Sequence, residues 1–313
     1  MSRMLLVALL SISPACAARP QEDTPTTLSG HTKAIRQIAF SPDSKTLAST
    51  SGDGAIVLWD VATGKKSAAL QHASVWCVAF SPDGKKLASA GDETELKLWD
   101  VSKAAELKST ARLENVVYSL AFNSDGKTIV EGRSDGAARM WDAETLKEKQ
   151  AKIQQYEKMT LFVRLTKDDK TLVSAGWGGP IKLYDVSAGK ELSSYDAKPV
   201  WANSVALDPE GKTVAAGSAK GTITLWSVET GSKLVDCEGH TETVSSLAFD
   251  DGKRLFSGSA DGTVRTWDTS TGRELKRYQH TKQVLSIAVS KDGRWLASGS
   301  SDTSIKLWEL KKP

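Results

Sequence analysis

The chain has 313 residues and a formal net charge of +3, with 40% hydrophobic and 25% charged residues. This composition is typical of a globular protein. Acidic and basic residues alternate along the chain, so it lacks the concentrated basic face that binding to a phosphate backbone requires. Nucleic acid is therefore not expected as a partner.

The first 17 residues differ from everything that follows them. Arg3 supplies a positive charge, residues 4–12 form an apolar run, and small residues at 15–17 stand where a signal peptidase cleaves. We expect residues 1–17 to be a signal peptide, too short to span a bilayer stably. The alternative of a buried strand is disfavoured because the run lacks a β-type pattern.

Cys16 gives the leader a second interpretation. Ala15 before Cys16 resembles the end of a bacterial lipoprotein signal, although Ser13 stands where such motifs usually carry Leu. Lipidation of Cys16 would anchor the protein to a membrane, with residues 18–25 as a polar linker. We expect an exported protein, periplasmic or secreted; the alternative is a cytoplasmic protein with an uncleaved leader.

A unit of roughly 40 residues occurs seven times in succession from Leu28 onward. Each unit carries an upstream turn, such as SPDS at Ser41, and most end in Trp-Asp. A fixed period of this length is typical of propellers and solenoids. The positions that define the period are Trp59, Trp99, Trp141, Tyr184, Trp226, Trp267 and Trp308.

Each unit is predicted to form four short strands, rich in β-branched or aromatic residues and separated by Gly, Asp or Pro. The first of these strands is apolar on both alternations, which favours an inner strand covered on both faces. In the first unit the expected strands are Ile35–Phe40, Thr46–Thr50, Ile56–Val61 and Lys66–Leu70.

The recurring Gly-His pairs at Gly30 and Gly239, the Asp-Gly turns and the Trp-Asp ends resemble the WD-repeat family of β-propellers. The resemblance covers residues 26–310 and implies an all-β fold: a seven-bladed β-propeller of four-stranded antiparallel blades. The chain stops after the third strand of the last unit. We expect Thr26–Ser29 to complete that blade, without supplying a core residue, and so to cover an open edge.

The resemblance also implies a hydrogen-bonded network of His, Ser, Asp and Trp within a blade. A His–Ser–Asp set can indicate a hydrolase, but its recurrence in three units favours a buried structural network. The second to fifth units lack one or more members. The complete sets are His31, Ser49, Asp53 and Trp59; His240, Ser257, Asp261 and Trp267; and His280, Ser298, Asp302 and Trp308.

The sequence carries no motif for an enzyme, a metal or a cofactor. It has no Gly-rich phosphate loop and no nucleophile elbow, and its four His residues fall in separate units. Cys77 and Cys237 are expected to lie beyond disulfide reach. We therefore expect a non-enzymatic protein without a cofactor.

The resemblance implies a scaffold that binds a protein or peptide on the face where first strands begin and second-to-third turns lie. On that face, large apolar groups gather in the second to fifth units beside one Arg, and such residues often anchor interfaces. The predicted partner-binding residues are Arg36, Trp76, Tyr118, Met159, Leu161, Trp177 and Trp201.

Two alternatives compete with this interpretation. The rings could plug the central channel or fill space left by missing network residues. The protein could instead be a hydrolytic or small-ligand-binding propeller acting at the channel mouth, but Arg36 and Asp92 are the only charges among the aligned positions. The expected state is a monomeric propeller within an assembly, reaching a membrane only if Cys16 is lipidated.

Overall fold

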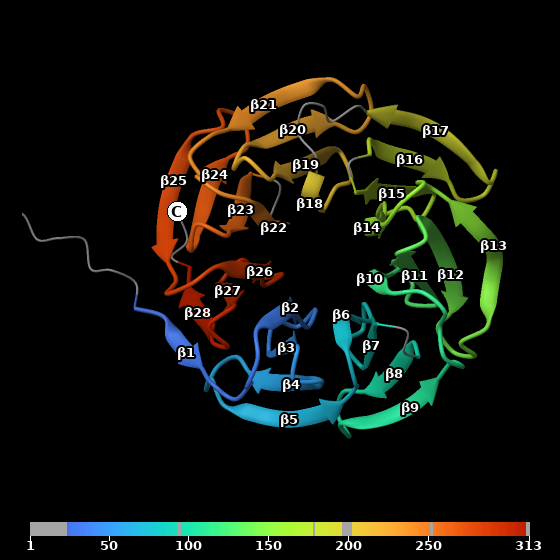
Figure 1. Ribbon diagram of the computed structural model, residues 1–313, viewed down its shortest axis with the longest axis horizontal. Coiled ribbons are helices and arrows are strands. Elements are labelled where there is room, and N and C mark those ends of the chain that lie inside the picture. The colour runs from blue at the N-terminus through green and yellow to red at the C-terminus, as the bar shows by residue number, and fades with distance from the viewer. Residues whose placement is uncertain (1–23, 93–94, 178, 196–201, 251–252, 311–313) are drawn as a thin grey trace, which may run out of the picture.

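The computed structural model describes residues 24–92, 95–177, 179–195, 202–250 and 253–310. Within these ranges the chain forms strands and turns and no helix. The strands make seven four-stranded antiparallel sheets arranged as blades around a central axis (Figure 1). The prediction of an all-β, seven-bladed propeller is confirmed.

Every blade runs from an inner strand beside the axis to an outer strand at the rim. Blades 1 to 3 comprise β2 (Ile35–Phe40), β3 (Thr46–Ser51), β4 (Ala55–Asp60) and β5 (Lys66–Gln71); β6 (Val75–Phe80), β7 (Lys86–Gly91), β8 (Lys97–Asp100) and β9 (Ala105–Ser109); and β10 (Val117–Phe122), β11 (Thr128–Arg133), β12 (Ala137–Asp142) and β13 (Glu148–Gln154).

The remaining blades repeat this order, except that the last takes its outer strand from the start of the chain. Blades 4 to 7 comprise β14 (Thr160–Leu165), β15 (Thr171–Gly176), β16 (Ile181–Asp185) and β17 (Lys190–Tyr195); β18 (Ala202–Leu207), β19 (Thr213–Ser218), β20 (Ile223–Ser227) and β21 (Lys233–Cys237); β22 (Val244–Phe249), β23 (Arg254–Ser259), β24 (Thr263–Asp268) and β25 (Glu274–Gln279); and β26 (Val284–Val289), β27 (Trp295–Ser300), β28 (Ile305–Glu309) and β1 (Thr26–Leu28).

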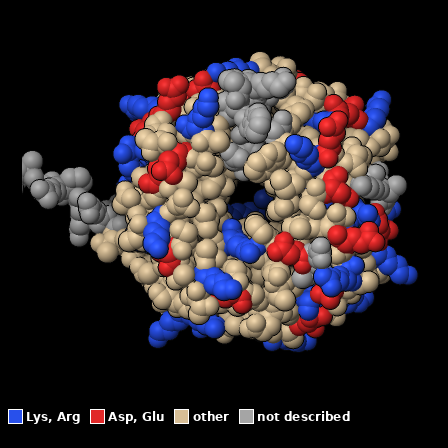
Figure 2. Space-filling model, viewed as in Figure 1, with Lys and Arg blue, Asp and Glu red and all other residues tan. Residues whose placement is uncertain are grey.

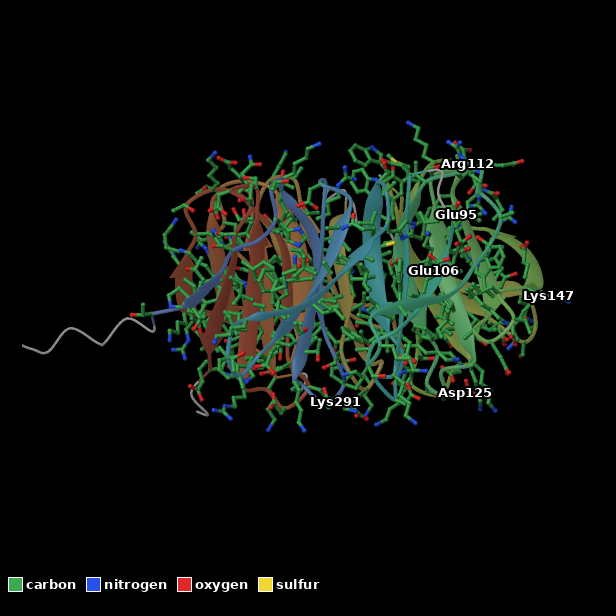
Figure 3. All side chains as sticks on the ribbon, turned by 90° about the horizontal axis from the view of Figure 1, so that it is seen from below. Glu95, Glu106, Arg112, Asp125, Lys147 and Lys291 are labelled. Carbon is green, nitrogen blue, oxygen red and sulfur yellow. The ribbon has the colours of Figure 1, made fainter. Side chains whose placement is uncertain are left out.

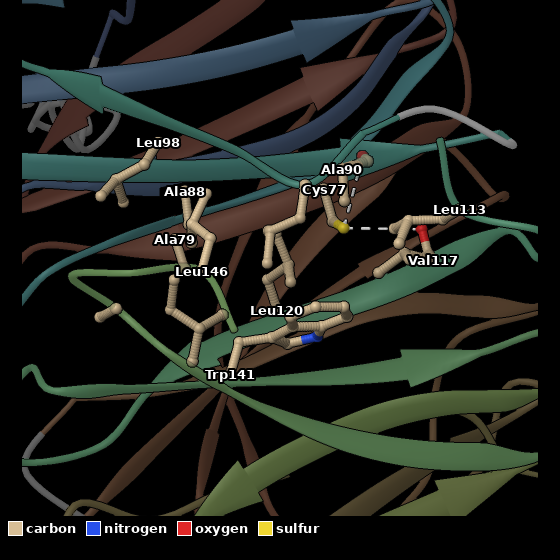
Figure 4. Close-up of a cluster of buried hydrophobic side chains, with 13 residues drawn as sticks. Cys77, Ala79, Ala88, Ala90, Leu98, Leu113, Val117, Leu120, Trp141 and Leu146 are labelled. Atoms are coloured by element: carbon tan, nitrogen blue, oxygen red, sulfur yellow. Dashed lines mark hydrogen bonds between the residues drawn. The ribbon is translucent and has the colours of Figure 1, made fainter. Parts of the chain in front are cut away.

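The hydrophobic core is divided among the junctions between blades. At the junction of blades 2 and 3, Cys77 and Leu98 pack with Leu120 and Trp141 (Figure 4). Second strands such as β3 are buried along almost their whole length, because a neighbouring blade covers each face. This explains their runs of small and apolar residues, whereas outer strands such as β9 are exposed.

Side chains at the third position of the inner strands form hydrogen bonds that join neighbouring blades. The Val78 N–H donates to Gln37 Oε1 (2.8 Å) and the Ile38 N–H to Ser286 Oγ (3.1 Å). Blade 4 differs, because its third residue is Phe162, which packs apolar surface against blade 5 instead. At the other junctions, Cys77 Sγ and Ser204 Oγ donate to the carbonyl oxygens of Val117 and Val244. Ser119 Oγ and Ser246 Oγ accept from the N–H groups of Val163 and Ile287.

The ring closes where β1 pairs antiparallel with β28, with Thr26 opposite Leu307. This confirms that the N-terminal strand completes the last blade. The expectation that the segment supplies no core residue was wrong, because Leu28 is only 2% exposed and packs in the cluster that contains Trp59 and Leu307. Thr26 and Thr27 are exposed, so the buried apolar contact of β1 comes from Leu28.

We predict that Leu28→Ala lowers the free energy of unfolding by about 2 to 4 kcal/mol, because it leaves a cavity at the closing junction. Chemical denaturation followed by tryptophan fluorescence measures the change. Thr27→Ala, on the same strand but exposed, is the matched control and should shift stability by no more than about 0.5 kcal/mol. Equal effects of the two substitutions would contradict a closing role for Leu28.

Candidate functional site

The two ends of the propeller carry different connections. Glu95, in the turn between β7 and β8, and Arg112, in the connection from blade 2 to blade 3, lie at one end (Figure 3). Asp125 and Lys291, in turns after inner strands, lie at the other. We call the first end the top face and the second the bottom face. Figure 2 shows the top face, with the central channel opening at its middle.

The channel has a volume of about 540 Å³ and is lined by the inner strands of all seven blades. The second residue of each inner strand stands near its top end, because these strands begin at the top face. In blades 1 to 4 the second residues are Arg36, Trp76, Tyr118 and Leu161, and all four line the channel.

Three of these residues form a stack across neighbouring blades. The Arg36 guanidinium carbon lies 3.7 Å from the centre of the Trp76 ring, which is a cation–π contact. The Trp76 and Tyr118 rings meet edge to face at 5.7 Å. All three side chains are half-buried. Burial, and then the Asp92 carboxylate, raise the pKa of Tyr118.

The other predicted partner-binding residues differ in their burial and contacts. Met159 is half-buried, and its carbonyl accepts a hydrogen bond from the Trp177 N–H at 2.9 Å. Trp177 follows β15, and 46% of its surface is exposed. Leu161 is half-buried at the channel. Trp201 lies outside the described residues.

The His–Ser–Asp–Trp network of blade 1 is present and buried. His31 Nε2 and the Trp59 indole N–H both lie 2.8 Å from Ser49 Oγ. The other ring nitrogen of His31 lies 3.0 Å from Asp53. Since Ser49 Oγ is shared by two partners and fully buried, the set has the character of a structural tie and offers no accessible nucleophile.

Blade 6 repeats this arrangement. His240 lies 2.8 Å from Asp261 and 2.7 Å from Ser257, and the Trp267 indole donates to Ser257 Oγ at 2.7 Å. Burial lowers the pKa of His240, which favours the neutral ring. Hydrogen bonds from Thr263 and His240 outweigh the effect of burial on Asp261 and hold its pKa at about 2.

Blade 7 departs from the prediction. His280 approaches Asp302 at 3.2 Å, but neither His280 Nε2 nor Ser298 Oγ has a hydrogen-bond partner. The network predicted for His280, Ser298, Asp302 and Trp308 is therefore incomplete at its centre. Trp308 stays buried and packs on Tyr278, with ring centres 5.2 Å apart.

Blades 3 and 4 replace the network with other buried polar groups. In blade 4, Ser174 bonds to Gln155 at 3.0 Å and to the Tyr156 hydroxyl at 3.1 Å. In blade 3, Glu131 takes the place of the Ser and lies 3.3 Å from Arg133. Burial raises the pKa of Glu131 to about 7, although Arg133 opposes the shift. The sequence analysis missed both substitutions.

Little in the described residues suggests metal or thiol chemistry. No group of three or more His, Cys, Asp or Glu within them could hold a metal ion. Cys77 and Cys237 are buried free thiols, and burial raises the pKa of Cys237 to about 12. The described ranges also hold no helix with the length and apolar character needed to cross a membrane.

Two family models match the chain. The model of the first β-propeller of IFT122 matches residues 21–236, and the model of the WD domain, G-beta repeat, matches residues 231–268 and 272–309.

Three curated relatives share short stretches with the chain. Protein Mut11 of Chlamydomonas reinhardtii is 56% identical over 39 residues, 12% of this chain and 10% of that protein. Small ribosomal subunit protein RACK1z of Arabidopsis thaliana is 47% identical over 49 residues, 16% and 15% of the two chains. WD repeat, SAM and U-box domain-containing protein 1 of Gallus gallus is 48% identical over 44 residues, 14% and 9%. The chain thus spans no more than 15% of the length of these relatives.

We predict that Asp261→Asn lowers the free energy of unfolding at pH 7 by about 2 kcal/mol. The folded-state pKa of Asp261, about 2, lies below its ordinary value of 3.8, so the carboxylate stabilises the fold above pH 4. That stabilisation is lost as the pH falls from about 4 to 2.

Denaturant titrations across this pH range should therefore show the difference between wild type and variant shrinking as the pH falls. Glu229→Gln, at an exposed turn position, is the control for loss of a carboxylate. A difference that stays constant from pH 7 to pH 2 would rule out a charge-dependent role for Asp261.

Proposed function

Since the chain belongs to the WD-repeat β-propeller family, we propose that it is a non-enzymatic scaffold that binds a protein or peptide on its top face. WD-repeat propellers are protein-interaction scaffolds, which supports the general assignment. Family membership alone does not locate a binding surface, so the choice of face rests on the side chains there.

The stack of Arg36, Trp76 and Tyr118 carries the proposal. Arg, Trp and Tyr are the residue types that contribute most to binding at protein interfaces. The cation–π and edge-to-face contacts hold the three side chains in one arrangement, so these side chains would lose little conformational entropy when a partner binds. We define the aromatic patch as these three residues together with Trp177.

Trp177 extends the aromatic patch onto the exposed surface. Its side chain is 46% exposed, whereas the stack at the channel mouth is half-buried. An exposed indole in a turn of the top face fits a partner with apolar side chains. The predicted residues Met159 and Leu161 would add apolar surface in the same blade, and Trp201 completes the proposed set.

We predict that Trp76→Ala/Trp177→Ala reduces capture of a partner from source-cell extract by about tenfold or more, because interface Trp residues dominate binding energy. Quantitative mass spectrometry of the captured proteins is the measurement. Leu192→Ala removes a similarly exposed apolar side chain, 52% exposed, from the outer strand β17 and is the control.

Thermal scans of the three proteins should accompany the capture, so that a fold defect is separated from a binding defect. A partner that is retained by the control and lost from the double variant supports the aromatic patch. Equal capture by all three proteins would move the binding surface away from the top-face stack.

We further propose that the protein is exported, on the evidence of the leader at residues 1–17. The intact mass of the protein isolated from its source cells should correspond to a chain that begins near residue 18, or at a lipidated Cys16. A mass that includes the leader would overturn export and favour a cytoplasmic protein.

A further inference from the structure

One level of the central channel departs from the sevenfold pattern of the inner strands. The fifth residue of β14 is Arg164, whereas every other inner strand carries Ala at that position. Arg164 therefore brings a long cation to a level where the other six inner strands carry a methyl group, and it lines the channel. The equivalent residues are Ala39, Ala79, Ala121, Ala206, Ala248 and Ala288.

Arg164 is accessible to solvent although protein surrounds it. Its side chain is exposed, and it lines both the channel and a hollow on the bottom face beside Asn123 and Leu207. The protein around the guanidinium removes part of its hydration, and this desolvation lowers its pKa. Figure 2 shows a Lys or Arg side chain deep within the opening seen from the top face.

Arg164 forms no ion pair with any described residue. By contrast, Arg265 on the third strand of blade 6 lies 2.7 Å from Glu274. Asp169 and Asp208 line the bottom hollow, but they accept hydrogen bonds from the N–H groups of Ser124 and Thr213 respectively. The residues that line the channel include Arg36 and Arg164 and no carboxylate.

The surroundings of Arg164 select one class of ligand. A guanidinium presents a planar fork of N–H donors that matches a carboxylate in a bidentate pair. The channel walls are mainly Ala and larger apolar side chains, and two of its serines, Ser119 and Ser286, already accept hydrogen bonds from neighbouring blades. A single unpaired guanidinium at this level, beside apolar side chains, suits a singly charged carboxylate with an apolar body better than a phosphate.

We propose that the central channel binds the carboxylate of a small apolar acid or of a peptide C-terminus, with Arg164 as the residue that pairs with it. The volume of about 540 Å³ is in the range of small-molecule sites. The site is separate from the aromatic patch, because Arg164 stands at the fifth position of its strand and the stack at the second.

Calorimetric titration of the full chain tests the proposal. The probes are phenylacetate, the tripeptide Leu-Ala-Phe with a free C-terminus, the same tripeptide amidated, and inorganic phosphate. We expect saturable binding of at least one of the two carboxylate probes, and none of the amide or of phosphate. Binding of the free acid, the peptide or both identifies the source of the carboxylate.

Arg164→Ala should weaken carboxylate binding by about tenfold or more, the loss of a charge-assisted pair. The substitution makes the ring uniformly Ala, so the variant is expected to fold, and a thermal scan checks this. Arg164→Lys keeps the charge without the fork and should bind with intermediate affinity. Arg273→Ala removes an exposed arginine elsewhere and should bind as wild type.

Binding of phosphate in preference to the carboxylates, equal binding by Arg164→Ala and wild type, or no binding of any probe would overturn the proposal. Trp177→Ala separates this site from the proposed scaffold function. It should leave carboxylate binding unchanged, so failure of the channel site and failure of the top-face partner give different results.

Discussion

The pairing of β1 with β28 is the constraint on which the rest of the structure depends. A second strand such as β3 is buried on both faces, so each blade needs a neighbour on each side. An open row of seven blades would leave two such faces to water, and ring closure removes both. Leu28 contributes directly, because the strand that closes the ring also fills part of the junction between the last blade and the first.

Closure fixes the inner strands in a common register, so the residues at the same strand position in all seven blades form one level of the channel. Each level is a ring of seven equivalent side chains, and function can arise wherever one ring loses its uniformity. The second level is aromatic and basic in three neighbouring blades. The third level joins blades, and the fifth carries one arginine among alanines. The same scaffold thus presents two chemically different surfaces along one axis.

The repeat period predicted the fold, the strand positions and the closing strand, because the pattern depends on many residues that agree with one another. The first-unit strands match the structure within one residue at each end. The misses concern single residues whose partners lie in other blades. The burial of Leu28 and the incomplete pairing of Ser298 depend on packing that no local pattern encodes.

Arg164 and Glu131 did leave a signal in the sequence, since each interrupts a column of Ala or Ser when the units are aligned. Both lie away from the strand ends at which a partner was expected, so neither was predicted as a functional residue. Glu131 has no role in the proposed function. It stands at a strand position where most other blades carry a Ser, and it forms a buried pair with Arg133. Such a pair costs desolvation of two charges and is weak evidence for added stability.

Phe162 makes one junction of the ring different from the other six. At six junctions the side chain of the third residue of an inner strand forms a hydrogen bond to the next blade. At the junction after blade 4, Phe162 stands at that position and makes apolar contacts among the described residues. That junction lies across the ring from the pairing of β1 with β28 (Figure 1). Apolar packing has no fixed direction, so at this level the junction of blades 4 and 5 lacks the directional constraint that hydrogen bonds give to the other six junctions.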